Sequence, residues 1–299
     1  MQVITLGNFD GVHRGHQAIV ALASSLAGER GTVTAVTFEP LPAAVLRPSA
    51  APPRLTLAAR RQHLLEQAGC TRVMVLDPAA GVLEQEPGEF IRQLRATVPF
   101  DAVVEGSDFR FGRRRAGSVE TLRLLGQQLG FRTVVAPEFE TSLADGLLVA
   151  PRSTTVRWLL ELGRVADAAR LLGRPHAVEG AVVQGDQRGR TIGFPTANVD
   201  CGALALPADG VYAGTAHTPL GMFAAAISVG TKPTFAAAPR TCEAFLLDFP
   251  GSVGEYGWPI RVEFHRWLRG QFRFASVPAL VEQMHRDTAQ CAAPQLVSP

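Results

Sequence analysis

The residues best suited to chemistry lie in one short run, GDQRGRTIGFPTAN, at positions 185–198. Its three glycines allow a positive φ or a close approach of the backbone to a ligand: Gly185, Gly189 and Gly193. Arg190 adds a guanidinium, whose planar fork of donors matches a phosphate group. The run therefore predicts a phosphate-binding loop. A basic hairpin followed by a tight turn would use the same residue types, so the local pattern leaves that alternative open.

Two neutral oxygen donors follow these glycines. Thr196 and Asn198 are two residues apart, so in an extended segment their side chains point to the same face. A hydroxyl and an amide oxygen beside an anion-binding loop suit Mg²⁺, which keeps several waters and bridges nucleotide phosphates. We predict that Thr196 and Asn198 are metal ligands, and that ATP contacts Gly185, Arg190, Gly193 and Thr196.

A second candidate site follows a short apolar run near the amino terminus, where GNFDGVHRGH occupies positions 7–16. If residues 3–6 form a strand and a helix starts near Gly15, free amides at the positive end of the helix dipole favour phosphate there. His13 and His16 are three residues apart, close to one helical turn, so both imidazoles can face one phosphate. Such a pair is also common on surfaces or in hydrogen-bonded cores. The predicted ATP contacts of this loop are Gly7, Asn8, Phe9, Gly11, His13 and His16.

Ser153, Thr154 and Arg157 form a further candidate group. Ser153 or Thr154 can cap a helix that runs on through Trp158 to Leu162, and Arg157 points back toward the same end. We predict that these three residues complete the ATP site at residues 7–16. An ordinary capped linker helix would show the same pattern.

The segment CEAFLLDF, at residues 242–249, predicts a strand in which Glu243 shares a face with Phe245 and Leu247. A glutamate on an inward face among apolar neighbours is costly unless it is used, for example as a base. On an outward face it would need no function. The sequence leaves the two possibilities nearly equal.

The elements that must position the loop at residues 7–16 alternate along the first half of the chain. Apolar runs at 3–6, 33–38, 72–76, 102–105 and 132–136 predict buried strands. Between them, helices are expected at about 15–27, 57–68 with Thr56 as N-cap, 87–96, and 119–129 with Ser118 as N-cap. This βαβ series predicts a Rossmann-like, doubly wound parallel sheet with its ligand at the carboxyl ends of the strands.

The second half has a different organisation. A short helix at 165–172 stops at Gly173, which marks the expected boundary between a domain at 1–173 and a domain at 174–299. Strands without interleaved helices are then expected at 177–184, 211–216, 224–229, 241–248 and 260–268. They predict a small antiparallel β-barrel, closed by a helix at 277–290 that Ser276 caps.

Composition narrows the classes of function. The chain has 299 residues and 46% hydrophobic content, enough for about two domains, and its formal charge of +2 gives no reason to expect a nucleic-acid partner. We find no signal peptide and no apolar stretch of membrane-spanning length, so we expect a cytoplasmic protein without a membrane partner. Four scattered cysteines predict reduced thiols. No sequence feature fixes an oligomeric state.

Taken together, these motifs resemble the bacterial bifunctional riboflavin kinase/FAD synthetase family. Four segments are similar to its riboflavin kinase half: the run at 185–198, LPADGVYAG, SVGTKPTF and CEAFLLDF. One segment, TLGNFDGVHRGH, is similar to its FAD synthetase (FMN adenylyltransferase) half. The resemblance implies ATP and Mg²⁺ with riboflavin, FMN and FAD as substrates and products. It also implies that Glu243 is the kinase base and that His13, His16 and Arg157 serve adenylyl transfer.

The resemblance further implies flavin-side positions. These are Asp108 and Phe109 in GSDFRFG, and Tyr256 and Arg269 in segments similar to the family's flap. Three positions depart from the pattern: Leu41 stands where a histidine is expected, Arg152 replaces the first serine of SSTxxR, and GEYG replaces DLYG. Because leucine can neither donate a hydrogen bond nor carry charge, we hypothesise reduced or lost FAD synthesis. Three alternatives are a kinase with a degenerate adenylyltransferase domain, a non-catalytic flavin-binding protein and an enzyme for a modified flavin.

Overall fold

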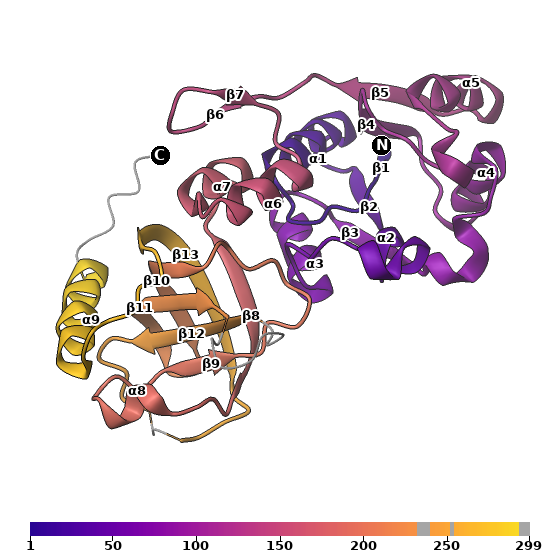
Figure 1. Cartoon of the computed structure of the whole chain (residues 1–299). Coiled ribbons are helices and arrows are strands. Elements are labelled where there is room, and N and C mark those ends of the chain that lie inside the picture. Colours follow the sequence, from indigo (N-terminus) through magenta and orange to yellow (C-terminus); the bar gives the residue numbers. More distant parts are fainter. Residues whose placement is uncertain (232–239, 252–253, 293–299) are drawn as a thin grey trace. The chain divides into compact units, whose positions relative to one another are not determined.

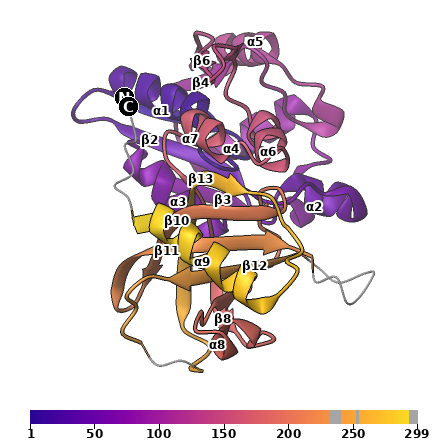
Figure 2. The ribbon, with the colours of Figure 1, turned by 60° about the vertical axis from the view of Figure 1, so that its left-hand side comes forward.

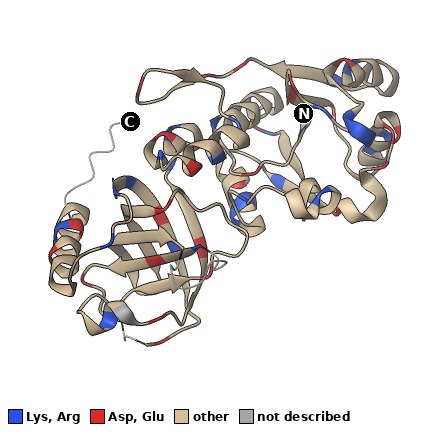
Figure 3. Ribbon diagram, viewed as in Figure 1, with Lys and Arg blue, Asp and Glu red and all other residues tan. Residues whose placement is uncertain are grey.

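The computed structural model describes residues 1–231, 240–251 and 254–292 and divides the chain into two compact units, 1–153 and 154–299 (Figure 1). The second unit thus begins after Ser153, so the short helices before Gly173 group with the barrel. Along the ribbon, Lys and Arg residues are interspersed with Asp and Glu residues in both units (Figure 3).

The first unit is built on a parallel sheet with the strand order β3-β2-β1-β4-β5. After β1, the chain adds β2 and β3 on one side of that strand and then β4 and β5 on its other side. The strand order therefore reverses between β1 and β4. In such sheets the crevice at the reversal is the usual ligand site. The strands are β1 (Gln2–Leu6), β2 (Thr32–Phe38), β3 (Arg72–Leu76), β4 (Ala102–Gly106) and β5 (Arg132–Ala136).

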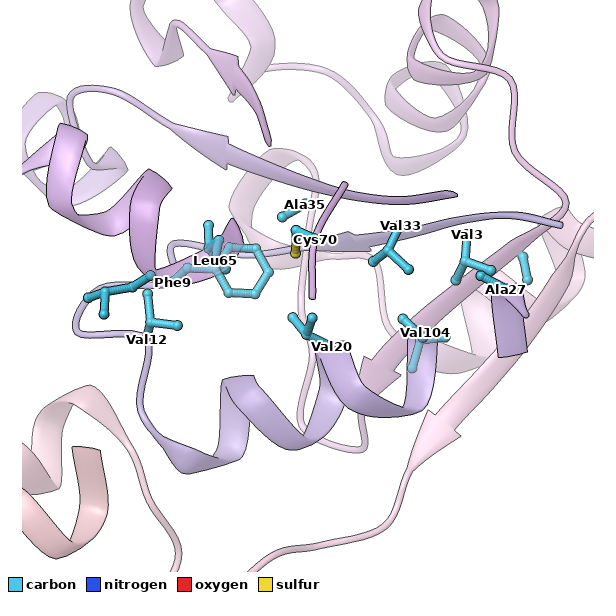
Figure 4. Packing of buried hydrophobic residues seen from close by; sticks show 13 residues of the cluster. Val3, Phe9, Val12, Val20, Ala27, Val33, Ala35, Leu65, Cys70 and Val104 are labelled. Carbon is cyan, nitrogen blue, oxygen red and sulfur yellow. The ribbon is translucent and has the colours of Figure 1, made fainter. Parts of the chain in front are cut away.

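Helices cover both faces of this sheet, as the predicted βαβ series requires. In β1, Val3 packs with Val20 of α1, whereas its neighbour Ile4 packs on the opposite face with Ile91 of α4. Figure 4 shows part of the first cluster, with Val20 of α1 turned toward the strands. The helices are α1 (Arg14–Ala27), α2 (Pro42–Leu46), α3 (Ala58–Gln67), α4 (Pro87–Thr97) and α5 (Val119–Leu129), with short helical segments at Pro48–Ala50, Pro78–Val82 and Arg113–Arg115 and a hairpin of β6 (Thr141–Ser142) and β7 (Leu148–Val149).

In the first unit, the predicted cap at Ser118 is confirmed and the one at Thr56 is wrong. Ser118 caps α5 in a capping box with Thr121. Thr56 does not cap α3, because Leu57 occupies the N-cap position. The Thr56 hydroxyl instead accepts a hydrogen bond from the Gly11 amide at 3.2 Å. The tertiary contact has displaced the local capping interaction.

The second unit is a closed antiparallel barrel with the strand order β10-β11-β12-β9-β8-β13. Its inward residues, such as Ile227, Ala244 and Val262, alternate with partly exposed neighbours. The elements are α6 (Ser153–Glu161), α7 (Val165–Leu172), β8 (His176–Val183), α8 (Arg188–Thr191), β9 (Ala197–Val199), β10 (Gly210–Thr218), β11 (Gly221–Gly230), β12 (Thr241–Leu246), β13 (Pro259–Arg269) and α9 (Val277–Ala292).

Several details of the barrel differ from the sequence-based expectation. β9 and α8 are absent from the predicted elements, and β12 ends at Leu246 because Asp248 turns the chain with a φ of +54°. The predicted stop of α7 at Gly173 is confirmed, since Gly173 adopts a left-handed conformation. Ser276 caps α9, which packs against β10 and β11 (Figure 2).

Candidate functional sites

The loop between β1 and α1 brings the two predicted histidines together. His13 is the N-cap of α1, which begins at Arg14, and its Nδ1 accepts a hydrogen bond from the His16 amide at 3.4 Å. The two rings stack with 3.6 Å between their centroids and 19° between their planes. The predicted juxtaposition of the imidazoles is therefore present at the start of the helix.

The environment of His16 favours a neutral imidazole. Burial lowers the pKa of His16 well below 6.5, and the neighbouring His13 lowers it further. Its Nδ1 is shielded from solvent and has no hydrogen-bond partner among the residues that the structure describes. The edge of the Phe9 ring lies against His16, with 5.1 Å between centroids. A neutral ring can donate one hydrogen bond to a phosphate without carrying a charge of its own.

The rest of this loop is supported by a side chain of its own that packs in the protein interior. Phe9 has a φ of +47° and is 1% exposed, so its ring packs in the core near Leu65 (Figure 4). A Cβ on Gly7 would lie 3.2 Å from that ring, so the backbone passes closely over it. Gly11 has a φ of +84°, which suits glycine. Phe9 thus shapes the loop from the interior, and its contact with ATP stays a prediction.

Ser153 is joined to the same loop. Its hydroxyl donates to the carbonyl oxygen of Asp10 at 2.7 Å. Ser153 is also the first residue of α6, so it lies inside the helix that it was expected to cap. Thr154 and Arg157 belong to the second unit, and their roles at this site stay predictions.

The flavin-side candidates of the first unit lie in the loop after β4. Phe109 stacks on Phe111, with 5.5 Å between centroids. Asp108 forms an ion pair with Arg152 at 2.9 Å, so the residue that departs from the family pattern reaches a candidate flavin residue. Both side chains are more than half exposed, which limits the strength of this pair. Leu41 is 8% exposed and precedes α2 as a packing residue.

Two buried ionisable residues of the first unit are absent from the predicted site. Glu105, 2% exposed, accepts a hydrogen bond from the Leu6 amide at 2.6 Å, and burial raises its pKa well above 4.5. Arg61 is 1% exposed and lies near Glu39. One sequence signal exists: Arg61 is spaced three and four residues from Leu64 and Leu65, on the buried face of α3.

The barrel brings together the residues predicted for phosphate and metal binding. Asn198 of β9 lies directly opposite Glu243 of β12 in the antiparallel ladder. The Thr196 hydroxyl donates to Oε2 of Glu243 at 3.3 Å. Thr196 and Asn198 line a pocket, and Glu243 is joined to this lining through its hydrogen bond with Thr196. The lining includes Gly185, Arg190, Thr196, Asn198, Tyr256 and Trp258.

The face on which Glu243 lies corrects one step of the sequence-based reasoning. Cys242, Ala244 and Leu246 point into the barrel and are buried, so Glu243 is on the outer, half-buried face. The inward-facing argument for a base is therefore wrong. What distinguishes Glu243 is its position beside Asn198 and Thr196 at the pocket.

The three glycines of the loop serve different purposes. Gly193 has a φ of +86°, as predicted for a left-handed position. Gly185 is required by close approach, because a Cβ there would lie 2.3 Å from the Asn198 amide nitrogen. A Cβ on Gly189, which lies within α8, would be 2.2 Å from the Phe194 carbonyl oxygen. These contacts fold the loop onto Asn198.

The two flap candidates lie in different surroundings. Tyr256 lines the same pocket as Thr196 and Asn198, and its hydroxyl accepts a hydrogen bond from Gln187 at 3.1 Å. Arg269 is bound through two nitrogens to Asp287 of α9, and its guanidinium lies over the Phe274 ring. The second half of the SVGTKPTF motif, from Lys232 on, falls outside the described residues.

The chain thus combines a parallel sheet whose strand order reverses at β1 in one unit with a closed barrel that bears a pocket in the other. The family model described as FAD synthetase matches residues 1–145, and the model described as riboflavin kinase matches residues 172–294. The chain belongs to the bifunctional riboflavin kinase/FMN adenylyltransferase family.

Relatives of that name match over nearly the whole chain. The Escherichia coli K12 protein is 36% identical and covers 95% of this chain and 90% of its own length. The Pseudomonas fluorescens protein is 37% identical and covers 99% of this chain and 93% of its own length. The Bacillus subtilis protein is 32% identical and covers 95% of this chain and 90% of its own length.

A solved structure described as a macrolide-efflux protein from Streptococcus pneumoniae is also similar. It superposes with a TM-score of 0.85 at 29% identity, and covers 96% of this chain and 92% of its own. Among the described residues, no helix is long and apolar enough to cross a membrane.

Proposed function

We propose that this chain phosphorylates riboflavin to FMN in its barrel and transfers an adenylyl group from ATP to FMN, giving FAD, in its parallel-sheet unit. Membership of the family supports both activities. The observation that carries the proposal is the contact of Thr196 with Glu243 beside Asn198 at one pocket. This combination places a carboxylate next to phosphate and metal donors, as phosphoryl transfer to an alcohol requires.

In the kinase reaction, Glu243 accepts the proton of the primary hydroxyl of riboflavin. The hydroxyl oxygen then bonds to the γ-phosphorus of ATP, the bond to the β-phosphate oxygen breaks, and ADP leaves. Arg190 lies in the pocket wall, where its fixed positive charge stabilises the transferring phosphoryl group. Gly185 and Gly193 let the backbone follow the phosphates closely.

The barrel pocket also fits Mg²⁺. Thr196 and Asn198 offer oxygen atoms, and the loop at Gly185 approaches Asn198 so closely that a Cβ would fill the space. Oxygen donors of this kind hold Mg²⁺ through few protein ligands and several waters. We assign Thr196 and Asn198 to the ion, which when bound neutralises charge on the ATP phosphates.

In the adenylyl-transfer reaction, a phosphate oxygen of FMN attacks the α-phosphorus of ATP and pyrophosphate leaves. We assign His13 and His16 to the phosphates of ATP, because their stacked rings lie at the start of α1, where anions are favoured. Gly7, Asn8, Phe9 and Gly11 shape that loop. Ser153, Thr154 and Arg157 complete the assignment.

The flavin assignments are Asp108 and Phe109 in the first unit and Tyr256 and Arg269 in the barrel. A kinase with a degenerate adenylyltransferase unit, suggested by Leu41, is not favoured, because the FAD synthetase family covers residues 1–145. The division at Gly173, the cytoplasmic location and the lack of a nucleic-acid partner stay predictions.

A pair of variants tests the assignment. Glu243→Gln is expected to abolish formation of FMN and ADP from riboflavin while FAD and pyrophosphate still form from FMN. His16→Ala is expected to have the opposite effect. Each variant is the control for the other, and loss of both activities in either variant would contradict the assignment of separate sites.

A further inference from the structure

Arg61 is a buried cation that no step of the proposed reactions uses. It lies in the first turn of α3, is 1% exposed, and is the largest fully buried side chain of the described residues. Taking a guanidinium out of water is costly unless its donors are matched. Its contacts therefore indicate what the burial achieves.

Those contacts join two loops at the carboxyl edge of the sheet. Nη1 donates to the Asn8 carbonyl oxygen, in the loop after β1, at 3.3 Å. Nη2 donates to the Phe38 carbonyl oxygen at the end of β2 at 2.7 Å and to Oε2 of Glu39 at 2.8 Å. One planar fork thus holds both loops at a fixed separation.

The segment just before α3 reinforces the same junction. Arg54 forms a two-point ion pair with Glu39, at 2.8 and 2.6 Å. The Leu55 and Thr56 amides donate to the Asp10 carboxylate at 3.0 and 3.2 Å. Both loops are therefore anchored to a single stretch of chain that ends in Arg61.

We propose that Arg61 is a positioning residue for adenylyl transfer, which fixes the loop leading into His13 and His16 relative to the loop after β2. The inference rests on the proposed function of the first unit. Arg61 acts through the backbone of Asn8 and Phe38 and does not itself contact the substrates. Misplacement of reacting groups by about 1 Å can lower a rate by about a hundredfold.

The test uses the full chain and measures FAD formation and riboflavin phosphorylation in parallel. Arg61→Met is expected to lower kcat for FAD formation by about tenfold to a hundredfold. Arg61→Lys keeps the charge but lacks the planar fork, so an intermediate kcat is expected. Riboflavin phosphorylation is expected to stay at the wild-type rate in both variants. Arg72→Met, at an exposed position that begins β3, is the matched control.

The outcomes separate this inference from the proposed function. A wild-type chain that makes no FAD contradicts the proposed function itself. A wild-type chain that makes FAD, with an unchanged kcat in folded Arg61→Met, overturns the role of Arg61. If Arg61→Met loses the thermal transition of the first unit, Arg61→Lys decides: a folded variant with wild-type kcat overturns the inference, whereas a reduced kcat supports it.

Discussion

Replacing Gly185 by alanine tests the geometry of the kinase pocket. The new Cβ would lie 2.3 Å from Nδ2 of Asn198 and 2.4 Å from its Cγ and Oδ1, whereas ordinary contacts begin near 3.4 Å. Relief requires a movement of about 1 Å, and the simplest movement turns the amide of Asn198 away from the pocket. Since a displacement of this size can cost about a hundredfold in rate, the barrier should rise by about 3 kcal/mol.

The assay is steady-state formation of FMN from riboflavin, with FAD formation from FMN as the internal reference. We expect Gly185→Ala to lose about a hundredfold in kcat for the first reaction and to retain the second. Gly202→Ala is the control for backbone strain, because Gly202 has a positive φ, at +49°, which Gly185 does not have, and no atom lies within 4 Å of its Cβ position. A wild-type kinase rate in Gly185→Ala would refute the reasoning, as would equal loss of both activities.

Two further predictions concern the metal and the pH dependence of the barrel. Thr196→Val removes the hydroxyl that donates to Glu243, so the Mg²⁺ concentration for half-maximal FMN formation should rise about tenfold, with Thr196→Ser restoring it. An unchanged Mg²⁺ titration would remove Thr196 from the metal site. Burial lowers the pKa of His176 to about 4. The free energy of unfolding of the barrel should therefore fall as the pH drops from 6.5 to 4. In urea unfolding, His176→Gln should lose less of this free energy over the same range.

The sign of the His176 effect follows from proton uptake. The unfolded chain protonates this histidine near pH 6.5, whereas the folded chain resists protonation until about pH 4, so acid favours unfolding between these values. The difference of 2.5 pH units corresponds to about 3 kcal/mol. Nε2 of His176 lies 2.7 Å from the Ala205 carbonyl oxygen. Since a carbonyl oxygen only accepts, Nε2 carries the proton and donates this hydrogen bond. A parallel acid loss in wild type and His176→Gln would contradict the argument.

Local signals predicted the regular parts of the fold because they depend on neighbouring residues. The alternation of strands and helices gave the parallel sheet, and Ser118 and Gly173 marked helix ends through their own hydrogen bonding and φ. Thr56 carried the same kind of signal as Ser118, yet its hydroxyl is used by Gly11, 45 residues earlier. A local pattern cannot reveal that competing tertiary partner.

The candidate sites were predictable where motifs carry the donors and unpredictable where the fold sets the direction of a side chain. Thr196, Asn198 and Glu243 were identified from their types and spacing. Alternation showed which residues share a face of β12 but not which face is inward, because closure of the barrel decides that. Arg61 was missed because a buried arginine is recognisable only once two distant loops supply its acceptors.

The central claim, that one chain carries both activities, is tested most directly by separating the products of two reactions. The purified chain is incubated with ATP, Mg²⁺ and either riboflavin or FMN, and flavins and nucleotide by-products are resolved by chromatography. We predict FMN with ADP in the first reaction and FAD with pyrophosphate in the second. FMN without FAD would contradict the assignment of the parallel-sheet unit, and the absence of both products would contradict the account as a whole.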